Sequence, residues 1–113
     1  ATRVSSKFTN ILKGIVRDRD RTIGIYVPLR AIPYLSLSNL DCKIRFFDDT
    51  DHWYGKSFDG VNIKIENINS LKENPVTDLF VMSLTFEEII CDKVSEIKGI
   101  NNIFKIRDLF DNE

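Results

Sequence analysis

The expected fold depends most on the stretch from Lys43 to Ile65, KIRFFDDTDHWYGKSFDGVNIKI. It opens with apolar residues that suit a buried strand over 43–48, and this strand ends in a run of aspartates. Carboxylates stay in a core only when their charges are paired, so the aspartates predict that the chain reaches the surface there. A polar and aromatic loop is expected over 49–60. The apolar–polar alternation of 61–65 predicts a second, half-buried strand at an edge of the sheet.

Apolar patterns on either side of this stretch predict further strands and helices. The run TIGIYV at 22–27 is apolar enough for a central strand buried on both faces, and Pro28 ends it. Apolar residues recur at helical spacing over 4–16 and 86–97, which predicts two amphipathic helices. The other expected features are a capping box of Thr85 with Glu88, a short helix that begins near Ile32, a helix over 67–73 capped by Asn67, strands over 78–84 and 103–106, and a tail without predicted structure from Arg107.

Strands that alternate with helices along a chain indicate a parallel sheet with helices on its faces. Right-handed crossovers then favour a strand order near 3-2-1-4-5, counted along the chain. The expected fold class is therefore α/β, a small Rossmann-like three-layer sandwich with a mainly parallel sheet. The length suits one core, so we expect a single domain over 1–113. Because the chain begins with Ala rather than Met, we expect a piece of a longer protein.

Composition argues against several classes of partner. The 16 basic and 17 acidic side chains leave a net charge of −1, which gives no electrostatic reason to expect binding to nucleic acid or to a membrane surface. No apolar run approaches the length of a membrane span, and the N-terminus lacks the apolar core of a signal peptide, so we expect a cytoplasmic protein. Cys42 and Cys91 have no metal-binding or redox spacing, and we expect both to be reduced thiols.

Three segments together resemble a known group of domains: FFDD at 46–49, GKSFDGVNI at 55–63 and DLFVMSLTFEEI at 78–89. They are similar to Rossmann-like domains of bacterial sugar-modifying and surface-polysaccharide enzymes. Two members of that group are the C-terminal domain of sugar C-methyltransferases and the nucleotide-binding domain that precedes nucleotide-sugar dehydratases. The resemblance implies a noncatalytic domain that binds a nucleotide or nucleotide-sugar, or a degenerate form of one. It also implies an attached catalytic domain, such as a methyltransferase, and a role in polysaccharide biosynthesis.

The turn after the first expected strand departs from that group. In those relatives, glycines at this turn let the backbone and a helix N-terminus approach a phosphate. Here residues 27–33 read VPLRAIP, which contains no glycine and has two prolines without N–H donors. We therefore do not expect a dinucleotide site of the usual kind, and the cofactor stays open between NAD and a nucleotide-sugar.

Asp48 and Asp49 lie about twenty residues after the first strand, where a Rossmann acid holds the hydroxyl groups of a ribose. They predict a hydrogen-bonding pair for a ribose or another sugar. The alternative is an aspartate-rich turn, because Asp side chains bond their own nearby backbone. Lys56 and Arg30 are candidates for a phosphate on charge alone. We expect the pocket at the carboxyl ends of the strands, with both aspartates beside Pro28 and Arg30.

Trp53 and Tyr54 place two amphipathic rings in a polar loop. Such rings stack on a sugar or base, anchor a protein interface, or fold back over the edge of a sheet, and the sequence leaves these roles open. His52 is the only histidine, and no catalytic partner or set of metal ligands is evident beside it. We therefore expect neither catalysis nor a metal site here.

Two functions follow from these residues. The alternative to the nucleotide- or nucleotide-sugar-binding domain is a protein-interaction or assembly module without a small-molecule ligand, which includes a homo-oligomer. The chain shows no nucleophile–base pair, so we do not expect it to be catalytic by itself. The expected ligand-binding residues are Arg30, Asp48, Asp49, Trp53, Tyr54 and Lys56.

Overall fold

The computed structural model describes residues 3–4, 6–31 and 43–111 of the chain. The short helix expected near Ile32 lies outside these residues, as does Cys42. Within the described residues, strands and helices alternate along the chain as predicted.

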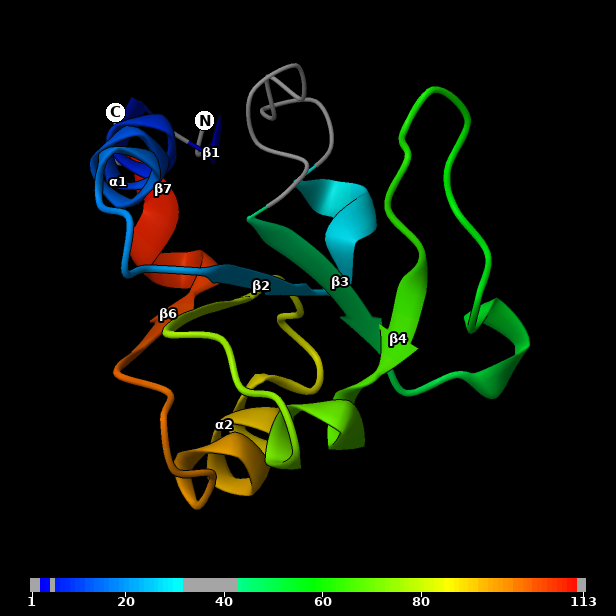
Figure 1. Ribbon diagram of the computed structural model, residues 1–113. Coiled ribbons are helices and arrows are strands. Elements are labelled where there is room, and N and C mark those ends of the chain that lie inside the picture. The colour runs from blue at the N-terminus through cyan, green and yellow to red at the C-terminus, as the bar shows by residue number, and fades with distance from the viewer. Residues whose placement is uncertain (1–2, 5, 32–42, 112–113) are drawn as a thin grey trace.

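Within the described residues, five parallel strands form the central sheet: β2 (Ile23–Tyr26), β3 (Ile44–Asp48), β4 (Ile65–Asn67), β5 (Asp78–Val81) and β6 (Asn102–Lys105) (Figure 1). Their order is β4-β3-β2-β5-β6, which is the predicted 3-2-1-4-5 when counted along the chain. The α/β class and the parallel sheet are thereby confirmed. β2 lies in the middle, and all four of its residues are buried because both faces of the sheet are covered.

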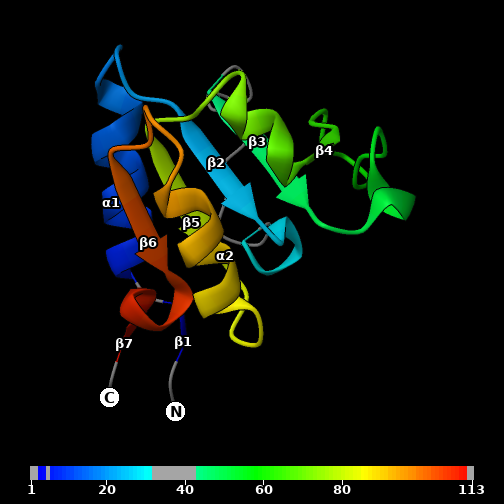
Figure 2. The same ribbon diagram turned by 90° about the horizontal axis from the view of Figure 1, so that it is seen from below.

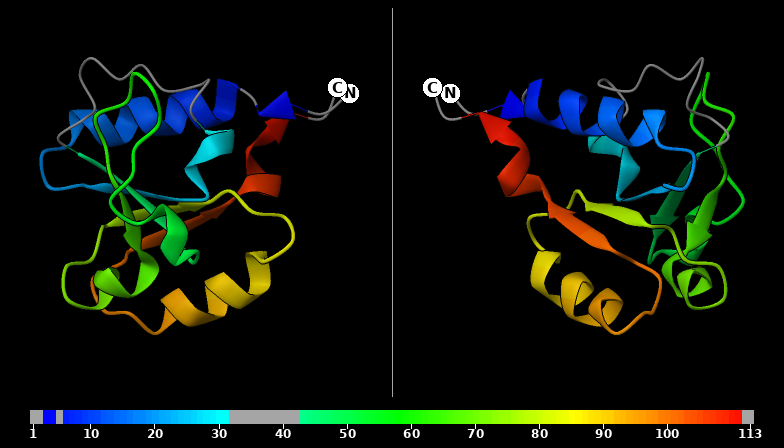
Figure 3. Two further views of the ribbon diagram at one scale, coloured as in Figure 1. Left: turned by 90° about the vertical axis from the view of Figure 1, so that its right-hand side faces the viewer. Right: turned by 60° about the vertical axis from the view of Figure 1, so that its left-hand side comes forward.

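Helices cover both faces of this sheet (Figure 3). The helix α1 (Ser6–Arg17) lies on one face, and α2 (Glu87–Ser95) lies on the other with the 3₁₀ helix η5 (Ile68–Lys72). Asn67 caps η5 as predicted, because its side-chain oxygen accepts a hydrogen bond from the N–H group of Asn69. The three layers are those of the expected sandwich.

The ends of the described chain form a smaller sheet. β1 (Arg3–Val4) pairs antiparallel with β7 (Phe110–Asp111), and the two termini lie side by side (Figure 2). The tail from Arg107, for which the sequence predicts no structure, continues the 3₁₀ helix η6 (Ile106–Leu109) into β7. Within the described residues 107–111, Leu109 packs into the core on the α1 side and so holds this part of the tail in place.

Two buried apolar clusters hold the layers together, one on each face of the sheet. Successive residues of a strand point to opposite faces, so a single strand contributes to both clusters. In β2, Ile25 belongs to the cluster on the α1 side and Tyr26 to the cluster on the α2 side. From the helices, α1 contributes Phe8, Leu12 and Ile15, and α2 contributes Ile90 and Val94.

The edge strand β4 begins later than predicted. Buried and exposed side chains alternate over 61–65 as expected, but only Ile65 of this segment pairs with β3. The backbone bonds the preceding loop instead: the N–H group of Ile65 donates to the carbonyl oxygen of Lys56 at 2.8 Å, and that of Gly55 donates to the carbonyl oxygen of Ile65 at 2.9 Å. The predicted bounds are therefore wrong, because 61–65 closes the loop that carries Trp53.

α2 presents a different face to the core from the one predicted. Ile90 and Val94 are buried as expected, but Phe86 is 52% exposed and Ile89 is 66% exposed. Glu87 occupies a core position in their place and is only 2% exposed. The prediction that Phe86 and Ile89 face the core is therefore wrong.

Glu87 stays buried because its charge is paired. Its carboxylate accepts a hydrogen bond from Nε of Arg107 at 3.0 Å and lies 3.9 Å from Nζ of Lys105. The predicted capping box is also wrong. The N-cap position of α2 is Phe86 rather than Thr85 and has no side-chain cap, and Oγ of Ser83 accepts a hydrogen bond from the N–H group of Phe86, just before the helix, at 3.1 Å.

A buried carboxylate joins the amino ends of three neighbouring strands. Asp78, the first residue of β5, is fully buried, and Arg21 donates two hydrogen bonds to it, at 2.6 and 3.0 Å. Asn102 at the start of β6 donates a third at 2.9 Å, and Thr77 donates a fourth at 2.7 Å. Burial opposes the charged form of Asp78, but these hydrogen bonds outweigh burial and hold its pKa below the usual value of an aspartate.

We expect Asp78→Asn to lower the free energy of unfolding by about 2–3 kcal/mol, because Arg21 loses its counter-charge. The loss stays below that for a fully buried pair, since the Arg21 side chain is 32% exposed and can be hydrated. Urea unfolding at neutral pH measures the difference. The matched control, Asp92→Asn at an exposed position of α2, should change the free energy by less than about 0.5 kcal/mol. Equal losses in the two variants would contradict the role of Asp78.

The same carboxylate predicts how stability depends on pH. Because its pKa is lower in the folded chain, its stabilisation is complete above the unfolded value of about 3.9 and is lost as the pH falls through the folded value. The difference in free energy of unfolding between the native chain and Asp78→Asn should be constant near neutral pH and shrink below about pH 4. Urea unfolding of both chains over a series of pH values checks this. If the difference in free energy of unfolding stayed the same in acid, the charge of Asp78 would not be its cause.

Candidate functional site

The carboxyl ends of β2 and β3 lie side by side at one edge of the sheet, which we call the carboxyl edge (Figure 2). Tyr26, the last residue of β2, pairs with Phe47, and β3 ends one residue later at Asp48. Open parallel sheets bind ligands in crevices outside such strand ends. The strand ends therefore place Asp48 and Asp49 next to the turn that follows β2.

Val27 makes this turn in a left-handed conformation, with φ of 59° and ψ of 67°. Among the described residues it is the one non-glycine residue with positive φ, and a β-branched side chain is strained there. Its N–H group donates to the carbonyl oxygen of Phe47 at 3.0 Å, and Pro28 has no N–H group. Neither Val27 nor Pro28 therefore offers a phosphate the backbone donor that a glycine-rich turn provides.

A cleft of about 160 Å³ opens beside this turn, and we call it the Trp53 cleft. Oδ1 of Asp48 accepts a hydrogen bond from the N–H group of Thr50 at 3.0 Å, which is the aspartate turn that the sequence left open. No described group donates to Oδ2 of Asp48, so none competes with a ligand for that oxygen. Apart from this carboxylate the walls are apolar, and the lining residues are Val27, Pro28, Leu29, Asp48, Trp53, Phe58 and Ile65.

A second hollow of about 340 Å³ lies toward the face that α2 covers, and we call it the Phe86 hollow. The hydroxyl of Tyr26 donates to Oδ2 of Asp49 at 2.8 Å; burial, together with this hydrogen bond, raises the pKa of Tyr26. Asp48 lines both spaces, whereas Asp49 lines only the Phe86 hollow. Oδ1 of Asp48 bonds Thr50 and Oδ2 of Asp49 bonds Tyr26, so the two aspartates that were expected to act as a pair share only the lining of the Phe86 hollow. The lining residues are Tyr26, Val27, Asp48, Asp49, Thr50 and Phe86.

The loop after β3 brings Trp53 to the wall of its cleft. Trp53 ends the 3₁₀ helix η4 (Asp51–Trp53), and its side chain is 45% exposed. Nζ of Lys56 lies 5.8 Å from the centroid of the Trp53 ring and 3.4 Å from Nε2 of His52.

Tyr54 instead packs, partly buried, against the core cluster on the α1 side and lines neither space, and burial raises its pKa. The sequence left three roles open for the two rings, and the position of Tyr54 corresponds to the third, in which the ring folds back over the sheet.

Arg30 is the last residue of the 3₁₀ helix η1 (Pro28–Arg30), whose first two residues line the Trp53 cleft. Its backbone is therefore next to the cleft, as expected, and its side chain lies outside the described part of the structure. The predicted residues that line the Trp53 cleft itself are Asp48 and Trp53, with Lys56 held against the Trp53 ring.

Two apolar residues that were not predicted for the site, Leu29 and Phe58, form walls of the Trp53 cleft. Leu29 is 65% exposed directly after the proline that ends β2. Phe58 packs edge-on against Phe46, with the ring centroids 6.2 Å apart. A signal for Phe58 was present, since it is a large apolar residue in a polar loop between Gly55 and Gly60.

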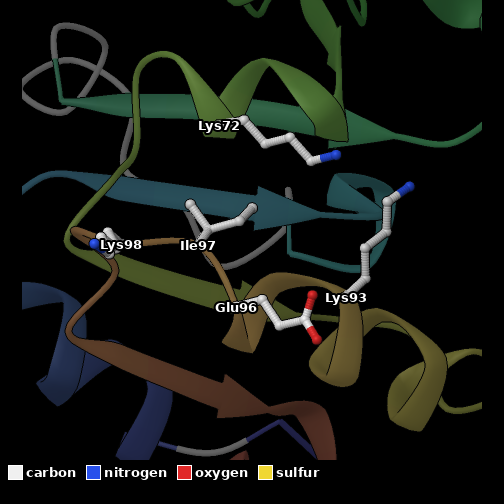
Figure 4. A pocket seen from close by; sticks show the side chains of 5 residues that line it. All are labelled: Lys72, Lys93, Glu96, Ile97 and Lys98. Atoms are coloured by element: carbon white, nitrogen blue, oxygen red, sulfur yellow. The ribbon is translucent and has the colours of Figure 1, made fainter.

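A third hollow, of about 470 Å³, lies between η5 and the C-terminal part of α2 (Figure 4). Lys72 reaches it from η5 and Lys93 from α2, while Lys98 lies toward its other end, and Glu96 supplies the one carboxylate of the lining. Cations near the C-terminal end of a helix stabilise its dipole, so Lys93 and Lys98 have a structural role there. We assign no ligand to this hollow.

Comparison with protein-family models, curated proteins and solved structures finds no match to this chain. No helix of the described residues is long and apolar enough to cross a membrane. The described His, Cys, Asp and Glu side chains form no group of three that could hold a metal ion.

We expect Val27→Gly to be more stable than Val27→Ala by about 0.5–1 kcal/mol, because only glycine adopts positive φ without steric strain. Both variants lose the same apolar side chain, so the comparison isolates the backbone. The matched control is the same pair of substitutions at Val16 in α1, where Val16→Ala should have a free energy of unfolding about 1 kcal/mol higher than Val16→Gly. Urea unfolding of the four variants measures both differences. If alanine were the more stable substitution at both positions, Val27 would not be strained.

Proposed function

We propose that this chain is a noncatalytic domain that binds a nucleotide or nucleotide-sugar and holds the nucleoside part of it in the Trp53 cleft. One observation carries the proposal. The cleft is an apolar slot at the carboxyl edge whose single carboxylate, Asp48, has an oxygen without a described donor. Parallel sheets of this kind use an acid at the same place to accept hydrogen bonds from ribose hydroxyls. The exposed ring of Trp53 provides a surface for base stacking.

The size of the cleft limits how much of the ligand it holds. At about 160 Å³ it is smaller than the roughly 300–1,000 Å³ of sites that enclose a drug-sized molecule. It therefore suits one ring system, a base or a sugar, with the rest of the ligand outside. Val27 and Pro28 offer no backbone donor to a phosphate, so Lys56 and Arg30 act on a phosphate through charge alone. We expect a nucleoside to retain most of the affinity of the nucleotide.

The sequence resemblance supports the wider setting of the proposal. Domains with similar segments belong to sugar-modifying and polysaccharide-biosynthesis enzymes, so the proposed parent protein carries a catalytic domain such as a sugar methyltransferase. NAD is the alternative ligand, because it contains the same ribose and base. A noncatalytic role agrees with the described contacts of His52, which are to Trp53 and Lys56 rather than to a nucleophile.

We expect adenosine, uridine, UDP-glucose or NAD to produce a saturable change in the fluorescence of Trp53, the single tryptophan of the chain. Asp48→Asn should weaken binding by about 10–100-fold, since a hydrogen bond to a charged group contributes about 1.5–3 kcal/mol. The dideoxynucleoside without ribose 2′- and 3′-hydroxyls should lose affinity for the native chain by a similar factor and lose nothing further in the variant.

The matched control is Asp59→Asn, which removes an exposed carboxylate of the same loop that does not line the cleft. Its affinity should equal that of the native chain. Failure of all four ligands to saturate at millimolar concentration, or equal weakening in both variants, would remove the proposed function.

A further inference from the structure

Three large apolar side chains are exposed around the start of α2: Leu84 by 46%, Phe86 by 52% and Ile89 by 66%. Phe86 and Ile89 are three positions apart and so lie on the same side of the helix. We call these three residues the Phe86 surface. Large apolar side chains gathered at one exposed place are typical of protein-interaction sites.

The fold holds these side chains outward. The inner side of α2 is filled by Ile90 and Val94, and Glu87 is buried there with its carboxylate bonded to Arg107. Turning the helix to bury Ile89 would separate Glu87 from Arg107 and leave a charge without its partner, which is strongly unfavourable. The exposure of the Phe86 surface is therefore a fixed property of the structure.

The Phe86 surface borders an acidic region. Phe86 itself lines the Phe86 hollow together with Asp48 and Asp49. Glu88 and Asp92 are exposed on α2. Asp48 and Asp49 thus adjoin Phe86 at the hollow, and Asp92 lies three positions from Ile89 on the same side of α2.

Neighbouring cations compensate only part of that charge. Lys93 is the one cation within α2. Lys105 and Arg107 lie at the buried Glu87, and with Asp108 they form a group without net charge. Four carboxylates against one lysine leave an excess of three negative charges at the surface.

We propose that the Phe86 surface binds a basic amphipathic segment of a partner protein. Its apolar side chains cover Leu84, Phe86 and Ile89, and its lysine or arginine enters the Phe86 hollow. There the cation meets the carboxylates of Asp48 and Asp49 and the ring of Phe86, which attracts cations to its face. A second copy of this chain is a poor occupant, because it would bring the same acidic charges together. The proposal does not depend on ligand binding in the Trp53 cleft.

Fluorescence anisotropy with two labelled peptides tests the charge of the partner. One is a helical peptide of about 18 residues with leucine on one face and lysine on the other, and the second has glutamate in place of lysine. The lysine peptide should bind the full chain at least about tenfold more tightly at low salt, and its affinity should fall as salt is added. Equal affinity for the two peptides, or no saturable binding of the lysine peptide, would overturn the proposal.

Variants test the surface. Phe86→Ser with Ile89→Ser should weaken binding of the lysine peptide at least about tenfold, because buried apolar anchors dominate such interfaces. Asp49→Asn with Glu88→Gln should weaken it and flatten the salt dependence. The matched control for the charges is Asp59→Asn with Glu73→Gln, which removes two exposed carboxylates that line neither the Trp53 cleft nor the Phe86 hollow and should leave peptide affinity unchanged.

Two further readings test the proposal, and the first of them uses the unaltered chain alone. Amide shifts of the unaltered chain on addition of the lysine peptide should concentrate at 48–50 and 84–89, and shifts confined to other segments would overturn it. Light scattering supplies the second reading. A dimer of the native chain that Phe86→Ser with Ile89→Ser abolishes would show a second copy on the surface in place of a basic partner.

Discussion

The buried carboxylate of Asp78 fixes the alignment on which the rest of this structure depends. Its hydrogen bonds from Arg21 and Asn102 join segments that are far apart in sequence. They lie where the pairing of the three strands begins, since Asp78 pairs with Ile23 of β2 and with Asn102 of β6. A slip by one residue would turn every side chain of a strand to the other face. By aligning the amino ends of β2, β5 and β6, this group also aligns the carboxyl ends of these three strands.

At the carboxyl edge the turn after β2 lacks the backbone donors of a phosphate site and presents apolar side chains in their place. Val27 adopts a strained left-handed conformation and gives its N–H group to β3. Strain of this kind persists only where the surrounding structure over-determines it, and it clusters at functional sites. Its effect here is to bring Pro28 and Leu29 over the end of the sheet as apolar walls. The cleft thus has apolar walls, and its turn offers no backbone donor from Val27 or Pro28.

The two faces of the carboxyl edge carry different surfaces because Asp48, the last residue of β3, and Asp49, the residue after the strand, have different surroundings. Asp48 adjoins the apolar cleft of Trp53, and Asp49 bonds Tyr26 in the hollow beside Phe86. One edge thus carries an apolar cleft on one side and a hollow lined by both aspartates on the other, and Asp48 lines both spaces.

Local patterns in the sequence determined the sheet and its strand order, because apolar runs of strand length and a helical repeat in α1 encode burial without reference to distant residues. They also placed Asp48 and Asp49 at a strand end beside Pro28. Tertiary structure alone decided which face α2 buries, since that depends on the pairing of Glu87 with Arg107, twenty positions away. It likewise decided the start of β4, where the N–H group of Ile65 bonds the loop at Lys56 and residues 61–64 do not pair with β3, and the left-handed Val27. Such features follow from long-range hydrogen bonds and ion pairs, whose partners no local spacing reveals.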